Sequence, residues 1–185
     1  MERVGAYALL TEKLEADNLV KHGLATEAIM RALARRFSED EELWGLTGLL
    51  HDLDLEIVGD DMSTHGQVTA DLLMEAGFPE EGVHAIRMHN TEGLGLGERT
   101  SRFEHSLAAA ETITGLIVAT ALVLPSKSLA DVKAKSVRKR MKETAFARGA
   151  RREVIMECEE AGVPLDEFID LSLEAMQGIA PELGL

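Results

Sequence analysis

Leu49-Leu50-His51-Asp52-Leu53-Asp54 is an apolar run that ends on an adjacent histidine and aspartate. Removing such polar groups from water costs free energy unless they bind a partner. An imidazole beside a carboxylate is a ligand pair that divalent metals accept. A single pair also occurs where a helix simply meets solvent, so its meaning depends on what the rest of the chain supplies.

The composition predicts one helical domain. The chain has 185 residues, 45% of them hydrophobic, which is enough for a sizeable core and argues against disorder. Aromatic residues make up only 4%, and this favours helices over sheets. We expect a single all-α bundle over residues 1–185, with its core at about 18–124 and C-terminal helices at 128–180 that pack on the core or form a dimer contact.

The cysteine content and the first residues point to a cytoplasmic protein, and the net charge limits its possible partners. The single Cys158 excludes an intrachain disulfide and fits a reducing compartment, and the first residues do not resemble a signal segment. The formal net charge of −14 disfavours a nucleic acid polymer as partner. Residues 127–152 nevertheless carry ten of the 19 Lys and Arg residues. The simplest interpretation of this basic segment is a solvated face that forms salt bridges with the acidic body.

The spacing of apolar residues predicts a series of helices. Asp17 or Asn18 is expected to cap the second helix, and Thr64 with Gln67 forms a capping-box pattern. Gly45 and Gly48 lie on the side of His51, where they would let another helix approach closely. The expected helices cover residues 2–15, 17–37, 41–52, 64–76, 80–89, 101–124, 128–144, 150–161 and 165–179, with loops at 53–63 and 90–99.

One of these segments, residues 107–124, is about long enough to span a bilayer. It contains Glu111, and Ala, Thr and Gly dilute its hydrophobicity. We interpret it as a buried core helix and expect no membrane partner. Glu111 is the only charged residue between Ser106 and Ser126, so its carboxylate must be neutralised, paired or bound to a cation.

Six polar residues share the apolar faces of the predicted helices. Each has an ordinary explanation alone, such as a hydrogen-bonded core histidine. Together, four imidazoles and two carboxylates could hold one metal ion with groups to spare, or two ions bridged by an aspartate. His84 is expected to be exposed and is not part of the set. The six residues are His22, His51, Asp52, His65, His89 and Glu111.

The order of these residues resembles the HD-domain superfamily of metal-dependent phosphohydrolases, from about residue 18 to residue 121. The resemblance rests on Gly48-Leu49-Leu50-His51-Asp52, His65-Gly66, Ile86-Arg87-Met88-His89, and Ala109-Ala110-Glu111 followed by Thr114-Gly115-Leu116. It implies a site for one or two divalent ions of Mn, Fe, Ni, Co, Zn or Mg. By this resemblance His22, His51, Asp52 and Glu111 hold the first ion, and His65 and His89 complete the second.

Three positions depart from the pattern of that superfamily. The late acidic ligand is usually aspartate, and here it is Glu111. Many two-metal members have a lysine three residues after the His-Asp pair, where this chain has Leu55. A second histidine often follows the position of His89, where this chain has Asn90. The last two departures argue against the phosphodiesterase activity that is found in the two-metal branch.

The resemblance implies a hydrolase that acts on a small phosphorylated metabolite or a nucleotide. Asp52 would bridge the two metal ions or orient the groups that they hold. Asp54 or Glu56, expected near the mouth of the site, would take the proton from the attacking water. Asp60 and Asp61 are interpreted as ordinary solvated acids. The residues expected to receive phosphate are Arg87 and, on the basic segment, Lys135 and Lys142.

Two alternatives remain open at the level of sequence. The same four histidines and two carboxylates serve di-iron oxygenases in a smaller branch of the superfamily. The other alternative is a non-catalytic binding or regulatory module that keeps the fold and binds a nucleotide or a partner. A homodimer is a separate possibility for the assembly of the chain. Iron-dependent activity with oxygen would identify the first, and ligand binding that survives metal removal would identify the second.

Overall fold

The structure is a computed structural model that describes residues 1–59 and 61–185. Every regular element among these residues is helical, as predicted. Asp60, expected to be a solvated acid, lies outside the described residues. The elements are α1 (Arg3–Lys13), α2 (Asp17–Phe37), α3 (Glu41–Leu50), α4 (Leu55–Val58), α5 (Gln67–Glu75), α6 (Glu80–His89), α7 (Thr91–Leu94), α8 (Arg102–Leu122), η1 (Leu129–Asp131), α9 (Ala134–Met141), α10 (Arg152–Ile155), η2 (Met156–Cys158), α11 (Leu165–Gly178) and α12 (Ala180–Leu183).

The close packing of α2 on α3 positions the His-Asp pair. A Cβ atom on Gly48 would lie 3.0 Å from the carbonyl oxygen of Thr26 and 2.9 Å from Cγ of Met30, both on α2. Only a residue without a side chain fits at this distance. The predicted role of Gly48 is therefore confirmed, and it brings the end of α3 against the middle of α2.

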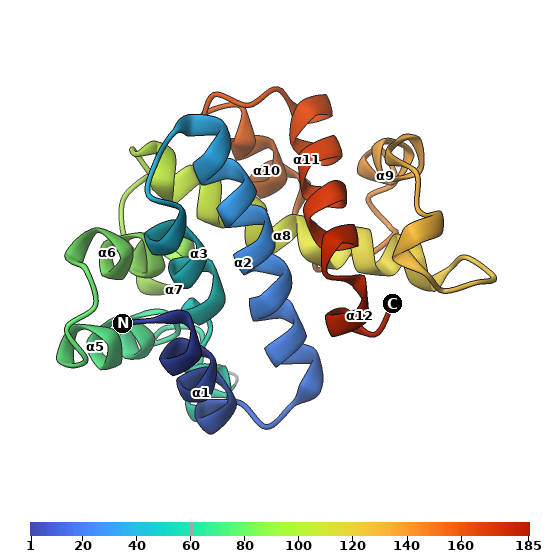
Figure 1. The fold of residues 1–185 in the computed structure, drawn as a ribbon. Coiled ribbons are helices and arrows are strands. Elements are labelled where there is room, and N and C mark those ends of the chain that lie inside the picture. The colour runs from blue at the N-terminus through green and yellow to red at the C-terminus, as the bar shows by residue number, and fades with distance from the viewer. Residues whose placement is uncertain (60) are drawn as a thin grey trace.

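The long helix α8 runs through the centre of the molecule behind α2 (Figure 1). It is the one described helix that is long and apolar enough to cross a membrane, but 67% of its most apolar window is buried in the protein. At the start of α8, Ser101 and Glu104 form a capping box, in which each side chain bonds the backbone amide of the other residue. The sequence did not predict this capping box. We interpret α8 as a core helix, in agreement with the sequence.

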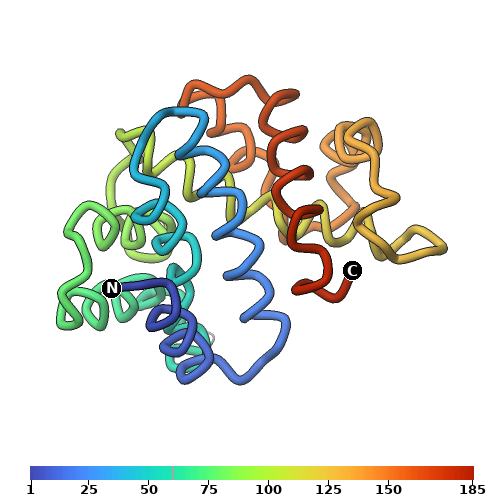
Figure 2. Tube along the Cα trace, viewed as in Figure 1, coloured from blue at the N-terminus to red at the C-terminus, as the bar shows by residue number. Residues whose placement is uncertain are grey.

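The remaining helices surround α2 and α8. The helices α5, α6 and α7 lie on one side of the molecule and α9 on the opposite side (Figure 1). The chain returns at its C-terminal end, so that α11 lies beside α2 (Figure 2). Buried side chains of α11 join the same core as those of α2 and α8, among them Phe168, Ile169 and Met176.

Two of the predicted helix caps are wrong. The N-cap of α2 is Ala16, without a side-chain hydrogen bond. The N-cap of α5 is Gly66, with a φ of +84°, and the pattern of Thr64 and Gln67 does not form a capping box. In both places an acid from another part of the chain bonds the backbone instead, and local spacing cannot reveal such a partner.

Several predicted element boundaries also differ. The two predicted loops contain the short helices α4 and α7. The helix expected over residues 128–144 is divided into η1 and α9, and the one expected over 150–161 into α10 and η2. By contrast, α3 begins after Asp40 as predicted, and that carboxylate accepts the amides of Glu42 and Leu43.

Candidate metal centre

The His-Asp pair lies in the turn that follows α3, and both side chains are buried. The Nδ1 atom of His51 donates a hydrogen bond to the carbonyl oxygen of Gly48, at 2.8 Å. The opposite ring nitrogen, Nε2, lies 3.3 Å from Oδ1 of Asp52 and 3.2 Å from Nε2 of His22. The backbone of α3 therefore aims one nitrogen of His51 into a polar cluster.

His22 enters this cluster from α2. Its Nδ1 lies 3.0 Å from the hydroxyl oxygen of Thr114 on α8. That hydroxyl already donates to the carbonyl of Glu111, at 2.6 Å, so it accepts the proton of His22 Nδ1. The Nε2 atom of His22 then faces Asp52, at 3.4 Å from Oδ2. His22, His51 and Asp52 offer ligand atoms that all lie within 4.8 Å of one another.

A second set of three ligands shares Asp52 with the first. Nε2 of His65 lies 3.4 Å, and Nε2 of His89 3.5 Å, from Oδ1 of Asp52. The two Nε2 atoms lie 3.0 Å apart. Nδ1 of His65 donates to Asp54, and Nδ1 of His89 donates to the carbonyl of Ile86. Asp52, His65 and His89 again lie within 4.8 Å of one another.

The hydrogen bonds fix which nitrogen of each ring carries a proton. All four Nδ1 atoms donate to an acceptor, so in the neutral rings all four Nε2 atoms carry lone pairs. With neutral rings, these lone pairs and the carboxylate of Asp52 face one another with no hydrogen between them, which is unfavourable unless a proton or a metal ion lies among them. The residues present therefore fit divalent metal ions, and the two sets can bind them.

Burial and mutual charge set the ionisation of the cluster. Burial lowers the pKa of His22 to about 4, which keeps this ring neutral and able to bind a metal. Burial by itself would raise the pKa of Asp52, but the imidazoles around it, above all His51, hold that pKa well below its usual range. Asp52 is therefore ionised and acts as the shared anionic group.

Asp54 does not lie at the mouth of the site, and this prediction is wrong. Its side chain is completely buried. One carboxylate oxygen accepts from His65 Nδ1 at 2.7 Å, and the other accepts the amides of Gly66 at 2.7 Å and Thr69 at 2.9 Å. Asp54 therefore orients His65 and bonds the first amides of α5.

Glu56, the other acid expected to take a proton, contacts a different part of the chain. It is exposed on α4, and its carboxylate accepts the backbone amides of Glu15 at 2.7 Å and Ala16 at 2.9 Å. These bonds tie α4 to the connection between α1 and α2. Glu56 is not among the described residues that line the cavity beside the cluster.

A cavity of about 340 Å³ adjoins the cluster, and we call it the metal cavity. Asp52, His65 and His89 form part of its wall. Glu111 lines it as well, with Thr112 donating to its carboxylate, but Glu111 lies outside the two compact sets. Burial raises the pKa of Glu111, although neighbouring imidazoles oppose the shift. The structure thus brings all six predicted residues to one region, five of them in direct proximity.

The three residues expected to receive phosphate lie elsewhere. Arg87 lines another cavity with Phe78 and His84. Lys135 lies on α9, on the far side of the molecule from α5 to α7, and Lys142 follows that helix (Figure 1). None of the three is among the described residues that line the metal cavity. His84 is exposed as predicted, with 58% of its side chain accessible.

Most of the basic segment behaves as a solvated face, but its end does not. Arg138 pairs with Asp166 at 2.6 Å and with Asp170 at 2.7 Å, both on α11, as the salt-bridge interpretation predicts. Arg151, in contrast, lines the metal cavity together with Gly149. The sequence pattern does not single out Arg151, because only the path of the chain after α9 brings it to the cavity.

Comparison with known proteins identifies one family. The HD-domain family matches residues 19–122, which is more than half of the 185-residue chain. No curated protein and no solved structure matches the chain. The matched residues include all six members of the polar cluster.

Proposed function

The chain belongs to the HD-domain family, and on that premise we propose that it is a metal-dependent hydrolase of small phosphate esters. The observation that carries this proposal is the position of Asp52, whose carboxylate faces four imidazole Nε2 atoms at 3.3 to 3.5 Å. Such a shared carboxylate between two histidine pairs is suited to one or two divalent ions.

The first ion would be held by His22, His51 and Asp52, with Glu111 as a further carboxylate from the cavity wall. The second would be held by Asp52, His65 and His89. Divalent ions, when bound, lower the pKa of water and neutralise phosphate oxygens. The chain's own contribution is to fix the ligands, since each Nδ1 bonds a group on the surrounding helices or turns.

The size of the metal cavity supports a small substrate. Its volume of about 340 Å³ is near the lower end of the roughly 300–1,000 Å³ typical of small-molecule sites. A phosphorylated metabolite fits this volume better than a large nucleotide conjugate. Asn90 does not offer its amide group to a substrate, because it donates to the carbonyls of Met62 and His65.

The test begins with protein purified without chelator or added metal. We expect one or two divalent ions per chain and release of inorganic phosphate from some member of a panel of phosphomonoesters and phosphodiesters. Chelation should abolish the release, and re-addition of metal should restore it. The matched control is His84→Ala, which removes an exposed imidazole outside the cluster. Failure to take up any metal on reconstitution would overturn the proposal.

A di-iron oxygenase is the second candidate. The observation in its favour is Leu55, a carbon side chain packed against the core at the position where two-metal phosphodiesterases often have a lysine. Two iron ions per chain together with oxygen uptake in a substrate screen would favour this activity. Phosphate release supported by manganese, cobalt or magnesium, without oxygen uptake, would exclude it.

A further inference from the structure

Arg151 is the one Lys or Arg among the described residues that line the metal cavity. The same wall contains the carboxylates of Asp52, Glu92 and Glu111. A guanidinium group keeps its charge at any physiological pH and presents several donors in a planar fork. Arg151 is therefore the described side chain best suited to bind an anion that enters this cavity.

The loop over residues 142–151, which carries Arg151, is held in shape by the next residue. The guanidinium of Arg152 donates to backbone carbonyl oxygens only, and one of these bonds, to Phe146, measures 2.6 Å. The loop has no regular secondary structure of its own, so these bonds take the place of a helix or strand ladder. The five acceptors are the carbonyls of Arg140, Glu143, Phe146, Ala147 and Ala150.

Arg151 contacts a carboxylate that it can exchange for another anion. Its Nη1 lies 3.3 Å from Oε1 of Glu92, and the two side chains are 42% and 53% exposed. An exposed ion pair of this kind contributes little stability, because water screens both charges. An anion that makes two parallel hydrogen bonds with the guanidinium competes effectively with this single contact.

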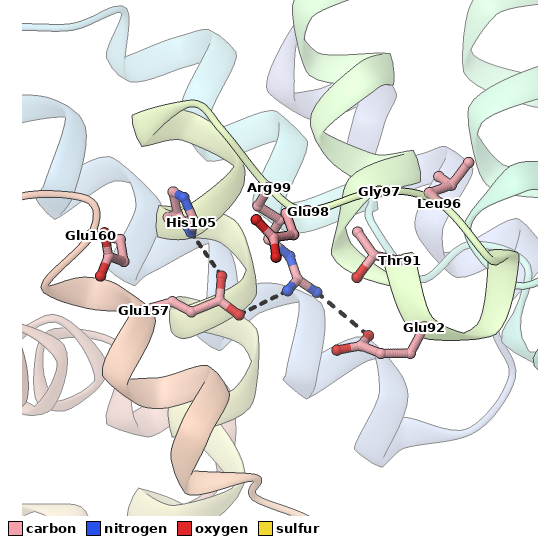
Figure 3. Close-up of a pocket in the computed structure, with 9 residues that line it drawn as sticks. All are labelled: Thr91, Glu92, Leu96, Gly97, Glu98, Arg99, His105, Glu157 and Glu160. Atoms are coloured by element: carbon pink, nitrogen blue, oxygen red, sulfur yellow. Dashed lines mark hydrogen bonds and ion pairs between the residues drawn. The ribbon is translucent and has the colours of Figure 1, made fainter.

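Glu92 keeps a partner when Arg151 leaves it. Its Oε2 lies 3.7 Å from Nη2 of Arg99, a side chain that is only 4% exposed (Figure 3). Arg99 is itself held by Glu157 at 2.8 Å and by the carbonyl oxygen of His89 at 2.8 Å. The exchange therefore leaves Glu92 with a cationic side chain beside it.

We propose that Arg151 binds a phosphoryl group in the metal cavity. In the absence of this anion, Glu92 forms an ion pair with the guanidinium of Arg151. The inference deepens the proposed function and rests on it for the identity of the anion. It assigns substrate recognition to the end of the basic segment, whereas the sequence pointed to Arg87, Lys135 and Lys142.

Binding of inorganic phosphate tests the inference without any need for turnover. Isothermal titration of the protein as purified is compared with Arg151→Met and with Arg148→Met, the matched control. Arg148 is an exposed arginine on the same loop, and its replacement makes the same change in net charge. We expect Arg151→Met to weaken phosphate binding roughly 10-fold or more, as loss of a charged hydrogen-bond donor predicts. Arg148→Met should change the affinity less than about twofold, because exposed charges outside the site are screened.

Replacement of Glu92 separates exchange at Arg151 from a general effect of charge. Glu92→Gln removes the competing carboxylate and should tighten phosphate binding several-fold. In the Arg151→Met background the same substitution should have no effect if Glu92 acts through Arg151. A gain of equal size in both backgrounds would overturn the exchange, and equal affinities of Arg151→Met and Arg148→Met would overturn the binding site.

Metal content and melting temperature, measured for every variant, distinguish this inference from the proposed function. Phosphate binding that depends on Arg151, together with a negative hydrolysis screen, would leave the anion site standing and reject the hydrolase. Phosphate release by the wild type, with phosphate affinity independent of Arg151, would support the hydrolase and reject the anion site at Arg151. Absence of saturable phosphate binding to the wild type overturns the anion site.

Discussion

Asp54 holds His65 through a hydrogen bond of 2.7 Å between Oδ1 and Nδ1, and Asp54 is completely buried. The other oxygen of Asp54 bonds the amides of Gly66 and Thr69, so one carboxylate fixes both the ligand and the start of α5. A carboxylate behind a ligating imidazole sets the tautomer of the ring and strengthens it as a ligand. The second ligand set thus depends on a residue that does not itself belong to either set.

Asp54→Asn should therefore weaken binding at the second set more than at the first. An amide cannot accept on both of its terminal atoms, so either His65 or the amides of α5 lose their partner. We expect a loss of about 10- to 100-fold in affinity for the weaker-bound ion, measured by titration of metal into stripped protein. Asp61→Asn, an identical change at an exposed acid, is the control. Unchanged binding of both ions would contradict the orienting role of Asp54.

Asp52→Asn and His22→Ala should reduce metal content by different amounts. Asp52 belongs to both ligand sets, so loss of its charge should reduce the metal content toward zero. His22 belongs to the first set only, and its removal should leave the ion held by His65 and His89. Elemental analysis of the purified variants gives the number of metal ions per chain directly. Equal metal content in the two variants would show that Asp52 is not shared.

The thiol of Cys158 should be inert in the native protein. Burial raises its pKa to about 12, so almost none of it is thiolate at pH 8. A disulfide reagent at pH 8 should react with this single thiol slowly in buffer and rapidly in guanidinium chloride. The denatured protein serves as its own control. A rapid native reaction would mean that η2 opens readily and would contradict the packing of this segment.

Arg152→Met should destabilise the protein and loosen the 142–151 loop. The substitution removes the shared donor of five backbone carbonyls. We expect the free energy of unfolding to fall by about 2 kcal/mol or more, in line with the loss of hydrogen bonds from a charged group. Trypsin should also cleave faster after Lys142 and Arg148, which mass spectrometry of early fragments would reveal.

Arg138→Met provides the matched control for that experiment. Arg138 makes its ion pairs with Asp166 and Asp170 on the exposed surface. Such pairs contribute roughly 1 kcal/mol or less. If both variants lose the same small amount of stability, and the loop is cleaved at the wild-type rate, Arg152 does not hold the loop.

The helical fold and the six polar residues that come together in one region could be predicted from the sequence alone. Helical periodicity placed His22 and His89 on buried faces, and Gly48 indicated a position where another helix approaches closely, which the structure shows to be α2. These inferences succeeded because each depends on spacing within one element. The same reasoning failed for the cap of α5, where the partner of the first amides is Asp54, a residue outside the helix.

The positions of the predicted residues relative to one another follow from the packing of the helices and loops in three dimensions. This packing placed Asp52 in both ligand sets, buried Asp54 behind His65, and brought Arg151 to the metal cavity while Lys135 lies on α9 at the far side. Each of these outcomes depends on where a turn or loop directs a side chain relative to distant elements. Periodicity specifies which face of a helix is buried, but hydrogen bonds and packing between elements fix the positions of the atoms that perform chemistry.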